Sequence, residues 1–286
     1  MSDKLPSSLS GALRVYHQGA HVVRSAAPER ELLFLSPHSR FEPGVPIRGG
    51  VPIIFPWFGD DPAGRGRGAH GFARKLPWRP VRACAETQEA IFELCDDVST
   101  RALWPGSFRL QLAVRARDGL AMELAVENRS GAAFECEIAL HTYLAVADVR
   151  RARVHGLEGA SYIDKADGGR VKTQGEGPIV FEGEVDRMYP GAGGTTWVED
   201  PVRGTRIDMV PSGSATTVVW NPGPKKGAEL GDLRDAWTGF VCVETACAGA
   251  DRLRLEPGAS HTLAVRMRAG GGAGAPKPYG SASSAS

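Results

Sequence analysis

The residues best suited to chemistry in this chain gather between Arg48 and Arg74, on segments rich in glycine and proline. Arg48 precedes a pair of glycines, and His70 begins the sequence His-Gly-Phe-Ala-Arg that ends at Arg74. A guanidinium group presents a planar fork of donors that matches phosphate or carboxylate, while glycine lets a backbone approach a ligand and proline restricts a loop. The combination predicts an anion-binding site, with phosphate on a small molecule as the first candidate. The alternative is that both arginines are surface charges beside ordinary turns.

Two candidates for proton transfer, His141 and Glu244, lie in apolar segments that alternate with the two-residue period of a β-strand. Between Phe134 and Tyr143 this period places His141 on the face opposite the Phe, Cys, Ile and Leu side chains. An imidazole in this setting can keep its pKa near neutrality and exchange protons with a substrate. The alternative is a structural histidine bonded to a polar group of a neighbouring strand.

Glu244 stands in the segment Phe240–Ala246, on the same face as Cys242. Burial of an unpaired carboxylate is costly, so Glu244 either has a partner or has a raised pKa that suits a general base. A glutamate on a solvated sheet face is the open alternative. If the sheet brings the two strands together, His141 and Glu244 flank one small substrate.

The absence of several well-known motifs limits the classes of reaction that the chain is expected to catalyse. The sequence contains no Walker loop and no HExxH or GxSxG sequence, which argues against most kinases, zinc proteases and serine esterases. Acid–base work on a phosphorylated small molecule remains, with neither metal nor cofactor expected. Opening of a sugar ring fits, because it needs only removal of a proton from one hydroxyl and protonation of the ring oxygen.

The composition of the 286 residues, 42% hydrophobic and 23% charged, is that of a globular protein. With a net charge of +1 and scattered basic residues, nucleic acid is not expected as a partner. The N-terminus lacks the apolar region of a signal peptide, and no window approaches the roughly 20 apolar residues of a membrane span, which predicts a cytoplasmic protein without membrane contact. Five cysteines without CxxC spacing indicate neither a disulfide framework nor a zinc site. We expect a monomer.

Strand-like alternation separated by turn residues recurs along the chain and predicts an all-β fold, a large antiparallel β-sandwich. Three sequential antiparallel strands are expected at Phe108–Val114, Met122–Val126 and Phe134–Leu140, with later strands near Val154, Ile179–Phe181, Thr216–Trp220, Phe240–Thr245 and His261–Met267. Only Glu229–Trp237 looks helical.

The domain organisation expected from the sequence is simple. No linker, repeat or composition break divides residues 11–268, which predicts one domain. Residues 1–10 are expected to be a flexible N-terminus. Residues 269–286 form a tail rich in Gly, Ala and Ser, whose composition predicts disorder.

Taken together, six ordered groups of residues resemble the hexose-6-phosphate mutarotases, also called glucose-6-phosphate 1-epimerases, of the aldose 1-epimerase superfamily. The groups are PIRGGVPIIFPWFG, AHGFAR, LHTYLAVADV with VHGLEGASYIDK after it, EVDRMYP, VVWNP and FVCVETA. The resemblance runs from about Gly11 to about Met267. It implies a large twisted β-sandwich with an active site on a sheet face, and interconversion of the α and β anomers of an aldohexose 6-phosphate, most simply glucose 6-phosphate.

The resemblance also implies roles for individual residues. His141, in the LHTY group, resembles the general acid that protonates the ring oxygen, and Glu244, in the CVE group, resembles the base that takes the anomeric proton. The implied binding residues are His70 and Arg74 for substrate contact, Arg48 for phosphate, Asp186 for sugar hydroxyls, and Trp57 and Phe58 for the pocket wall.

Some residues and rival functions stay open at this level. Arg65 and Arg67 precede the HGFAR group and are expected to be solvated, whereas Lys225 and Lys226 either lie near the anion or point into water. A noncatalytic module that binds or senses a sugar phosphate is the main alternative function. A glycoside-cleaving enzyme is the third, although Glu244 then has only Asp186 as a second carboxylate.

Overall fold

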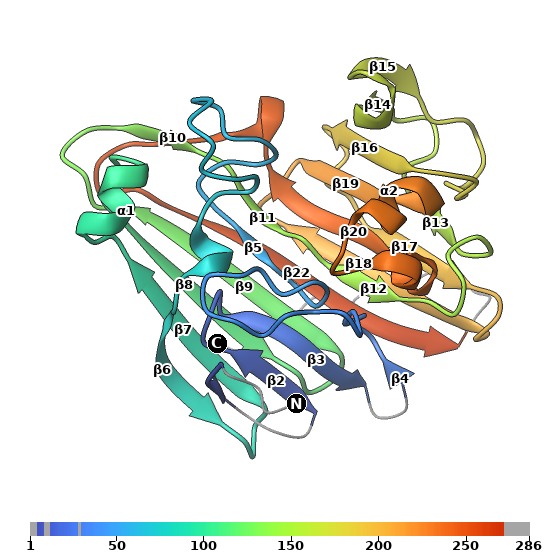
Figure 1. Ribbon diagram of the computed structural model, residues 1–286, viewed down its shortest axis with the longest axis horizontal. Coiled ribbons are helices and arrows are strands. Elements are labelled where there is room, and N and C mark those ends of the chain that lie inside the picture. The colour runs from blue at the N-terminus through green and yellow to red at the C-terminus, as the bar shows by residue number, and fades with distance from the viewer. Residues whose placement is uncertain (1–4, 9–11, 28–29, 272–286) are drawn as a thin grey trace, which may run out of the picture.

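The computed structural model describes residues 5–8, 12–27 and 30–271, and most of its strands form two large antiparallel sheets (Figure 1). In spatial order the first, called the site sheet, contains β15 (Arg170–Thr173), β14 (Ser161–Asp164), β16 (Val185–Pro190), β19 (Thr216–Asn221), β20 (Phe240–Cys247), β11 (Ile138–Leu140) and β5 (Ile53–Ile54), and β12 (Tyr143–Ala145) also pairs with β20. The second, called the support sheet, contains β13 (Arg153–His155), β17 (Thr196–Asp200), β18 (Thr205–Ser212), β22 (Ser260–Gly271), β9 (Leu120–Asn128), β8 (Phe108–Arg115), β7 (Glu89–Cys95) and β6 (Arg79–Cys84).

Smaller elements surround these sheets. Four N-terminal strands form a separate sheet, β1 (Ser7–Ser8), β2 (Leu13–Tyr16), β3 (His21–Ala27) and β4 (Arg30–Glu31), and β10 (Phe134–Cys136) pairs with β21 (Leu253–Leu255). The helices of the described residues are α1 (Val98–Leu103), α2 (Gly223–Glu229) and four 3₁₀ turns at Ala73–Lys75, Lys165–Asp167, Arg234–Gly239 and Gly249–Asp251. In Figure 1, α1 lies at the left end of the molecule and α2 at the right. Within the described chain, no helix has the length and apolar character needed to cross a membrane.

The core lies between the two sheets and follows from the alternation of their strands. On the support sheet, Phe108, Leu110 and Leu112 of β8 are buried while the residues between them are partly exposed. On the site sheet, Val219, Val241 and Val243 join the same apolar cluster. Full burial of such a side chain contributes about 1.5–3 kcal/mol, so dozens of them favour this packing strongly. The expected all-β antiparallel sandwich is confirmed.

Strand β20 is buried at all of its positions, which explains its nearly continuous apolar run. Val241 and Val243 face the core between the sheets, whereas Cys242 packs in a separate cluster with Tyr143 and Trp220. Glu244 shares the face of Cys242, because successive side chains alternate across a strand. The second face of β20 is therefore covered by other segments and is not a solvated sheet face.

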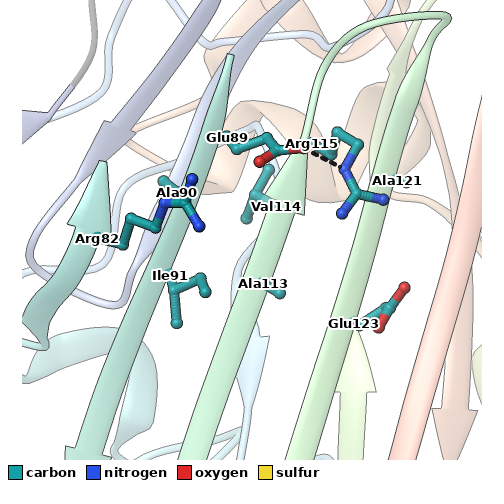
Figure 2. Close-up of a pocket in the computed structure, with 9 residues that line it drawn as sticks. All are labelled: Arg82, Glu89, Ala90, Ile91, Ala113, Val114, Arg115, Ala121 and Glu123. Atoms are coloured by element: carbon teal, nitrogen blue, oxygen red, sulfur yellow. Dashed lines mark hydrogen bonds and ion pairs between the residues drawn. The ribbon is translucent and has the colours of Figure 1, made fainter. Parts of the chain in front are cut away.

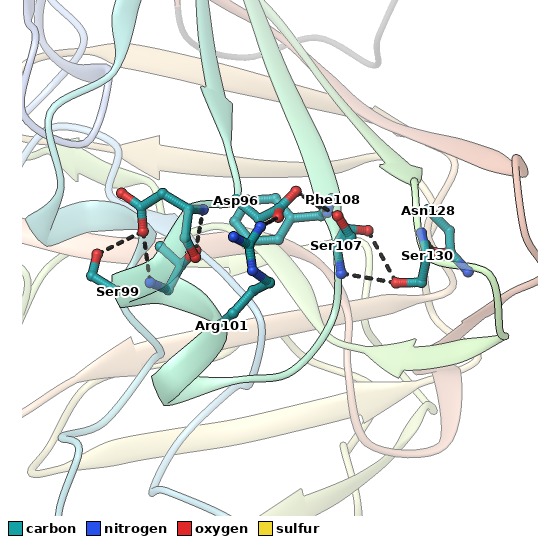
Figure 3. A network of polar contacts seen from close by, with 9 residues as sticks. Asp96, Ser99, Arg101, Ser107, Phe108, Asn128 and Ser130 are labelled. Carbon is teal, nitrogen blue, oxygen red and sulfur yellow. Dashed lines mark hydrogen bonds and ion pairs between the residues drawn. The ribbon is translucent and has the colours of Figure 1, made fainter.

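A polar network at one rim fixes the connection between β7 and β8 (Figure 3). Asp96 accepts hydrogen bonds from Ser107 Oγ at 2.8 Å and from the backbone N–H of Phe108 at 2.9 Å, and it pairs with Arg101 of α1. The Asp97 side chain accepts from the backbone N–H of Thr100 in a capping box that begins α1. The carbonyl of Leu103, at the end of α1, accepts from Arg67, so this short helix also supports the loop that leads to His70.

Several expected elements differ in the structure. The third strand expected, Phe134–Leu140, is divided into β10 and β11, and β10 pairs with β21 while β9 pairs with β8 and β22. Around Val154 and Ile179 the chain forms β13 and an isolated bridge, without a strand at Ile179–Phe181. Local alternation identifies extended segments but carries no information on which distant strand becomes the partner.

The helical expectation at Glu229–Trp237 was wrong in its bounds. Helix α2 ends at Glu229, and a 3₁₀ turn follows at Arg234–Gly239, while α1 was not expected at all. Ala269–Gly271 of the expected tail continue β22 and pair with Thr205–Ile207 of β18. The remaining tail residues, 272–286, and residues 1–4 and 9–10 of the expected flexible N-terminus lie outside the described residues, whereas Ser7 and Ser8 form β1.

Candidate active site

A cavity of about 620 Å³ lies on the face of the site sheet that points away from the core between the sheets. Its wall is formed by Arg48, Phe58, Gly59, Asp60, Ala69, His70, Arg74, His141, Lys165, Asp186, Val218, Trp220, Lys226, Leu230 and Glu244. The volume is in the range of cavities that hold small-molecule ligands. A hollow on the outer face of the support sheet (Figure 2) measures only about 140 Å³ and is lined by strand residues such as Ala113 and Glu123.

His141 and Glu244 meet at the centre of this site. The His141 Nε2 atom lies 3.3 Å from Glu244 Oε1, and the two side chains are 8% and 1% exposed. Strand β20 pairs with both β11 and β12, and His141 lies in the short break between those two strands. The backbone N–H of Val243 donates to the carbonyl of Thr142 at 3.2 Å, which holds this break against β20. The contact therefore follows from pairing between segments about a hundred residues apart.

Burial shifts the pKa values of this pair in opposite directions. It raises the pKa of Glu244 well above its usual range, helped by the nearby carboxylate of Asp186. It lowers the pKa of His141 well below its usual range, and the charges of Arg74 and Arg48 add to this effect. Both shifts favour the neutral carboxylic acid and the neutral imidazole. His141 Nδ1 and Glu244 Oε2 have no hydrogen-bond partner among the described residues.

His70 is held beside His141 by an unusual backbone. Its φ is 64°, and the next residue, Gly71, has φ 66°. The backbone N–H of Gly59 donates to His70 Nδ1 at 3.2 Å, so a neutral His70 carries its proton on Nε2. Its ring lies 5.6 Å from the His141 ring, edge to face. Burial lowers the pKa of His70 to about 3, with Arg74 as a further cause, which keeps this ring a neutral donor.

The two arginines differ in their partners. Arg48 Nη1 donates to the Tyr143 hydroxyl at 3.0 Å, and Arg48 Nε lies 3.1 Å from Asp232 Oδ2. Arg74 donates from Nη2 to the carbonyl of Ala69 at 2.8 Å, and among the described residues no carboxylate lies within ion-pair distance of it. Its Nε has no hydrogen-bond partner there either, and burial lowers its pKa to about 10. A nearly buried, unpaired guanidinium is costly unless an anionic ligand binds it.

The remaining expected residues take different places. Asp186 of β16 lines the cavity next to Trp220, its pairing partner on the neighbouring strand β19. Burial raises the pKa of Asp186. Phe58 lines the cavity and packs edge to face on His70 at 5.0 Å. Trp57 does not line it: this side chain is buried behind the wall and donates from Nε1 to the carbonyl of Gly68 at 3.1 Å. Trp57 thus supports the loop from the core side, where its ring packs edge to face against Phe72.

The expectation that Arg67 is solvated was wrong. Its guanidinium pairs with Asp61 and lies 4.3 Å from the Trp57 ring, so it braces the loop before His70. Arg65 is exposed, as expected. Of the two lysines left open, Lys225 is exposed, whereas Lys226 lines the cavity and lies 2.5 Å from Glu184.

Sequence reasoning missed Lys165, Trp220 and Leu230 as lining residues. Lys165 and Trp220 stand inside the groups SYIDK and VVWNP quoted above, but neither the period nor the spacing marks them as functional. Lys165 lies 4.6 Å above the Phe58 ring and has no ion-pair partner among the described residues. No cluster of three or more His, Cys, Asp or Glu side chains in the described part of the chain is suited to hold a metal ion.

The two-sheet fold and the cavity define an antiparallel β-sandwich with a small-molecule site on one sheet face. Comparison with known proteins gives the family: the chain belongs to the aldose 1-epimerase family, whose profile, described as "Aldose 1-epimerase", matches residues 9–268.

Relatives and solved structures agree with this assignment. A protein from Salmonella typhimurium named "Putative glucose-6-phosphate 1-epimerase" is 36% identical over 244 residues, which is 84% of this chain and 81% of that protein. A protein of the same name from Escherichia coli K12 is 37% identical over 236 residues, 81% of this chain and 78% of that protein. The crystal structure of "a putative mutarotase (YeaD)" from Salmonella typhimurium has a TM-score of 0.83 and 32% identity, and the match covers 91% of this chain and 87% of that one.

Proposed function

We propose that this protein is a hexose-6-phosphate mutarotase that interconverts the α and β anomers of an aldohexose 6-phosphate, with glucose 6-phosphate as the first substrate to test. One observation carries the proposal: the His141–Glu244 contact lies in the same cavity as Arg74, a half-buried guanidinium without a carboxylate partner among the described residues. The pair supplies the acid and the base for proton transfer. The unpaired guanidinium favours a substrate that carries an anionic group such as phosphate. The names of the relatives support the same substrate.

In the proposed mechanism Glu244, as a carboxylate, takes the proton of the anomeric hydroxyl, and protonated His141 gives its proton to the ring oxygen. The bond between the anomeric carbon and the ring oxygen breaks, which leaves an aldehyde, a new hydroxyl, a neutral imidazole and a carboxylic acid. Rotation about the bond between the first two carbons presents the other face of the aldehyde. The reverse transfers close the ring and restore both side chains, so no proton is gained or lost.

The shifted pKa values suit this cycle. Ring opening converts the charged pair into the neutral pair, and burial stabilises the neutral pair. The cationic side chains of Arg74 and Lys165 favour the carboxylate form of Glu244 and so oppose that effect. A balance between the two forms is what acid–base catalysis in both directions requires. Asp186 and His70 Nε2 remain to bind sugar hydroxyls.

Exchange between anomers, followed by two-dimensional exchange NMR, tests the proposal. Wild-type protein is expected to accelerate exchange of glucose 6-phosphate, and His141→Asn and Glu244→Gln are each expected to lower the rate by about 10²- to 10⁴-fold, the usual contribution of general acid–base catalysis. Unchanged exchange in both variants would falsify these roles. Binding of glucose 6-phosphate without acceleration by the wild type would instead favour a noncatalytic sugar-phosphate module.

The same assay is then run with glucose, galactose and galactose 6-phosphate. The ratios of the exchange rates show which hexose is preferred and how much the phosphate group accelerates exchange. Release of aryl alcohol from an aryl glycoside is the corresponding test for glycoside cleavage. A cytoplasmic location and a monomeric state remain predictions, to be checked by cell fractionation and sedimentation.

A further inference from the structure

Tyr143 connects the two halves of the site without lining the cavity. Its hydroxyl accepts the hydrogen bond from Arg48 Nη1 at 3.0 Å. Its ring stacks on the His141 imidazole, with centroids 5.0 Å apart and planes inclined by 13°. It is 2% exposed and is absent from the cavity wall. One side chain thus touches both the candidate phosphate ligand and the candidate general acid, although it faces no substrate.

Hydrogen bonds of its N–H and its carbonyl hold the backbone of Tyr143 in place. The N–H of Tyr143 donates to the carbonyl of Gly50 at 2.9 Å, and its own carbonyl accepts from Phe34 at 3.0 Å. In β12 it pairs with Cys242, two residues before Glu244 on β20. Gly50 lies two residues after Arg48, so the segments that carry Arg48, His141 and Glu244 converge on Tyr143. A buried side chain held this way has little freedom to change rotamer.

Aromatic neighbours hold the Tyr143 ring in place. Trp220 contacts it edge to face at 6.1 Å, and Phe240 packs at 5.0 Å. Trp220 also contacts the His141 ring edge to face, at 5.9 Å. The imidazole is therefore enclosed by rings on two sides, which restricts its orientation toward Glu244.

We propose that Tyr143 is a positioning residue for the mutarotation, whose hydroxyl orients Arg48 toward the substrate anion and whose ring orients His141 toward the ring oxygen. This inference rests on the function proposed above. Asp232 forms an ion pair with Arg48, at 3.1 Å from Nε. With both partners in place the guanidinium is held before substrate binds, which lowers the ordering cost of the binding step.

The two parts of Tyr143 are separable by substitution. Tyr143→Phe removes the hydroxyl and keeps the stacked ring, so the KM for glucose 6-phosphate is expected to rise about five- to tenfold, with kcat within twofold of wild type. The kcat/KM for free glucose is expected to stay within twofold. Tyr143→Leu also removes the ring, and kcat is then expected to fall about tenfold for both sugars. Restoration of kcat by phenylalanine but not leucine marks the ring as the element that acts on His141.

Tyr189→Phe is the matched control, because Tyr189 is equally buried and its hydroxyl lies 3.1 Å from Gln174 Oε1, away from the cavity. It loses one buried hydrogen bond without touching Arg48. Should Tyr143→Leu fail to unfold cooperatively, Tyr143→Met provides the same test with a longer apolar side chain.

Three results would overturn the inference. They are a Tyr143→Phe enzyme that behaves like Tyr189→Phe, equal losses for glucose and glucose 6-phosphate in Tyr143→Phe, and a kcat in the folded leucine or methionine variant that matches wild type. Failure of the proposed function is distinguishable, because the wild type itself would then not accelerate anomer exchange. If the wild type is active and Tyr143→Phe is unchanged, only the role of Tyr143 is lost.

Discussion

Among single residues, Glu244 shows most clearly how a group needed for catalysis can lower the stability of the fold. Its carboxyl group is 1% exposed, it faces His141 at 3.3 Å, and its second oxygen has no hydrogen-bond partner among the described residues. A group in this position is unfavourable in its charged form, and burial raises its pKa accordingly. A site that needs the carboxylate in its reaction cycle therefore keeps it at a cost to folding.

Glu244→Gln is expected to make the protein more stable relative to wild type as pH rises. The folded-state pKa of Glu244 is raised above the unfolded value of about 4.3. Between those two pKa values the folded state keeps a proton that the unfolded state releases, so wild-type stability falls with pH by up to about 1.4 kcal/mol per unit. Glutamine does not titrate and lacks this loss.

Urea unfolding from pH 5 to pH 8.5 measures this difference. Glu123→Gln on β9 is the control, because Glu123 is exposed and its change is expected to add the same small amount at every pH. A constant gap between Glu244→Gln and wild type across the range would contradict the raised pKa.

At this scale the two-residue period predicts the faces of His141 and Glu244, because alternation in a strand is a local property. Packing decides the rest. The two-residue period places Tyr143 on the same face as His141. Nothing in the sequence shows that the Tyr143 hydroxyl reaches Arg48, 95 residues away. Trp57 and Phe58 are adjacent and similar in type, and only the loop conformation decides that Phe58 faces the cavity while Trp57 lies behind it.

The loop from Phe55 to Lys75 is the element that depends most on a single residue, Gly71. A Cβ atom at Gly71 would lie 1.9 Å from the carbonyl oxygen of Phe55, and the residue has φ 66°. The backbone N–H of Phe72 donates to that same carbonyl at 3.0 Å. The close approach holds the start of the His-Gly-Phe-Ala-Arg segment against β5, which places His70 and Arg74 in the cavity wall.

Gly71→Ala is expected to destabilise the fold and to slow anomer exchange, because the backbone must move and His70 must move with it. Gly64→Ala in the same loop is the matched control: Gly64 has φ 61°, and a Cβ there meets nothing within 4 Å. Both variants incur the cost of a positive φ, so their difference isolates the close approach, expected to be about 1–3 kcal/mol. Denaturant unfolding and exchange NMR measure it, and equal losses in the two variants would exclude this role for Gly71.

Elements with a continuous hydrophobic pattern are the ones that the sequence predicts well. β8, β9, β19, β20 and β22 all contain the segments expected, because burial of one or both faces imposes their patterns. Short elements with few core contacts escape prediction. Helix α1 has a capping box but only Thr100 buried, and α2 begins after a proline in a stretch without an apolar stripe.

For the whole molecule, the distribution of charge decides how a substrate anion arrives. The chain has a net charge of only +1, yet four cationic side chains line one cavity: Arg48, Arg74, Lys165 and Lys226. Arg48 and Lys226 are paired with carboxylates, whereas Arg74 and Lys165 have none within ion-pair distance among the described residues. Positive charge is thus concentrated at the cavity, where it attracts a phosphorylated sugar and not a neutral one.

This arrangement predicts that salt weakens binding of glucose 6-phosphate selectively. Raising sodium chloride from about 0.01 M to 0.15 M shortens the Debye length from about 30 Å to about 8 Å, so the KM for the phosphorylated sugar is expected to rise several-fold while that for glucose stays constant. Arg74→Ala is expected to raise the first KM at low salt and to reduce its salt dependence, because one of the two unpaired cations is gone. The same salt response for glucose and glucose 6-phosphate would contradict an electrostatic contribution from the cavity. A salt response that persists unchanged in Arg74→Ala but disappears in Lys165→Ala would move that contribution from Arg74 to the more exposed Lys165.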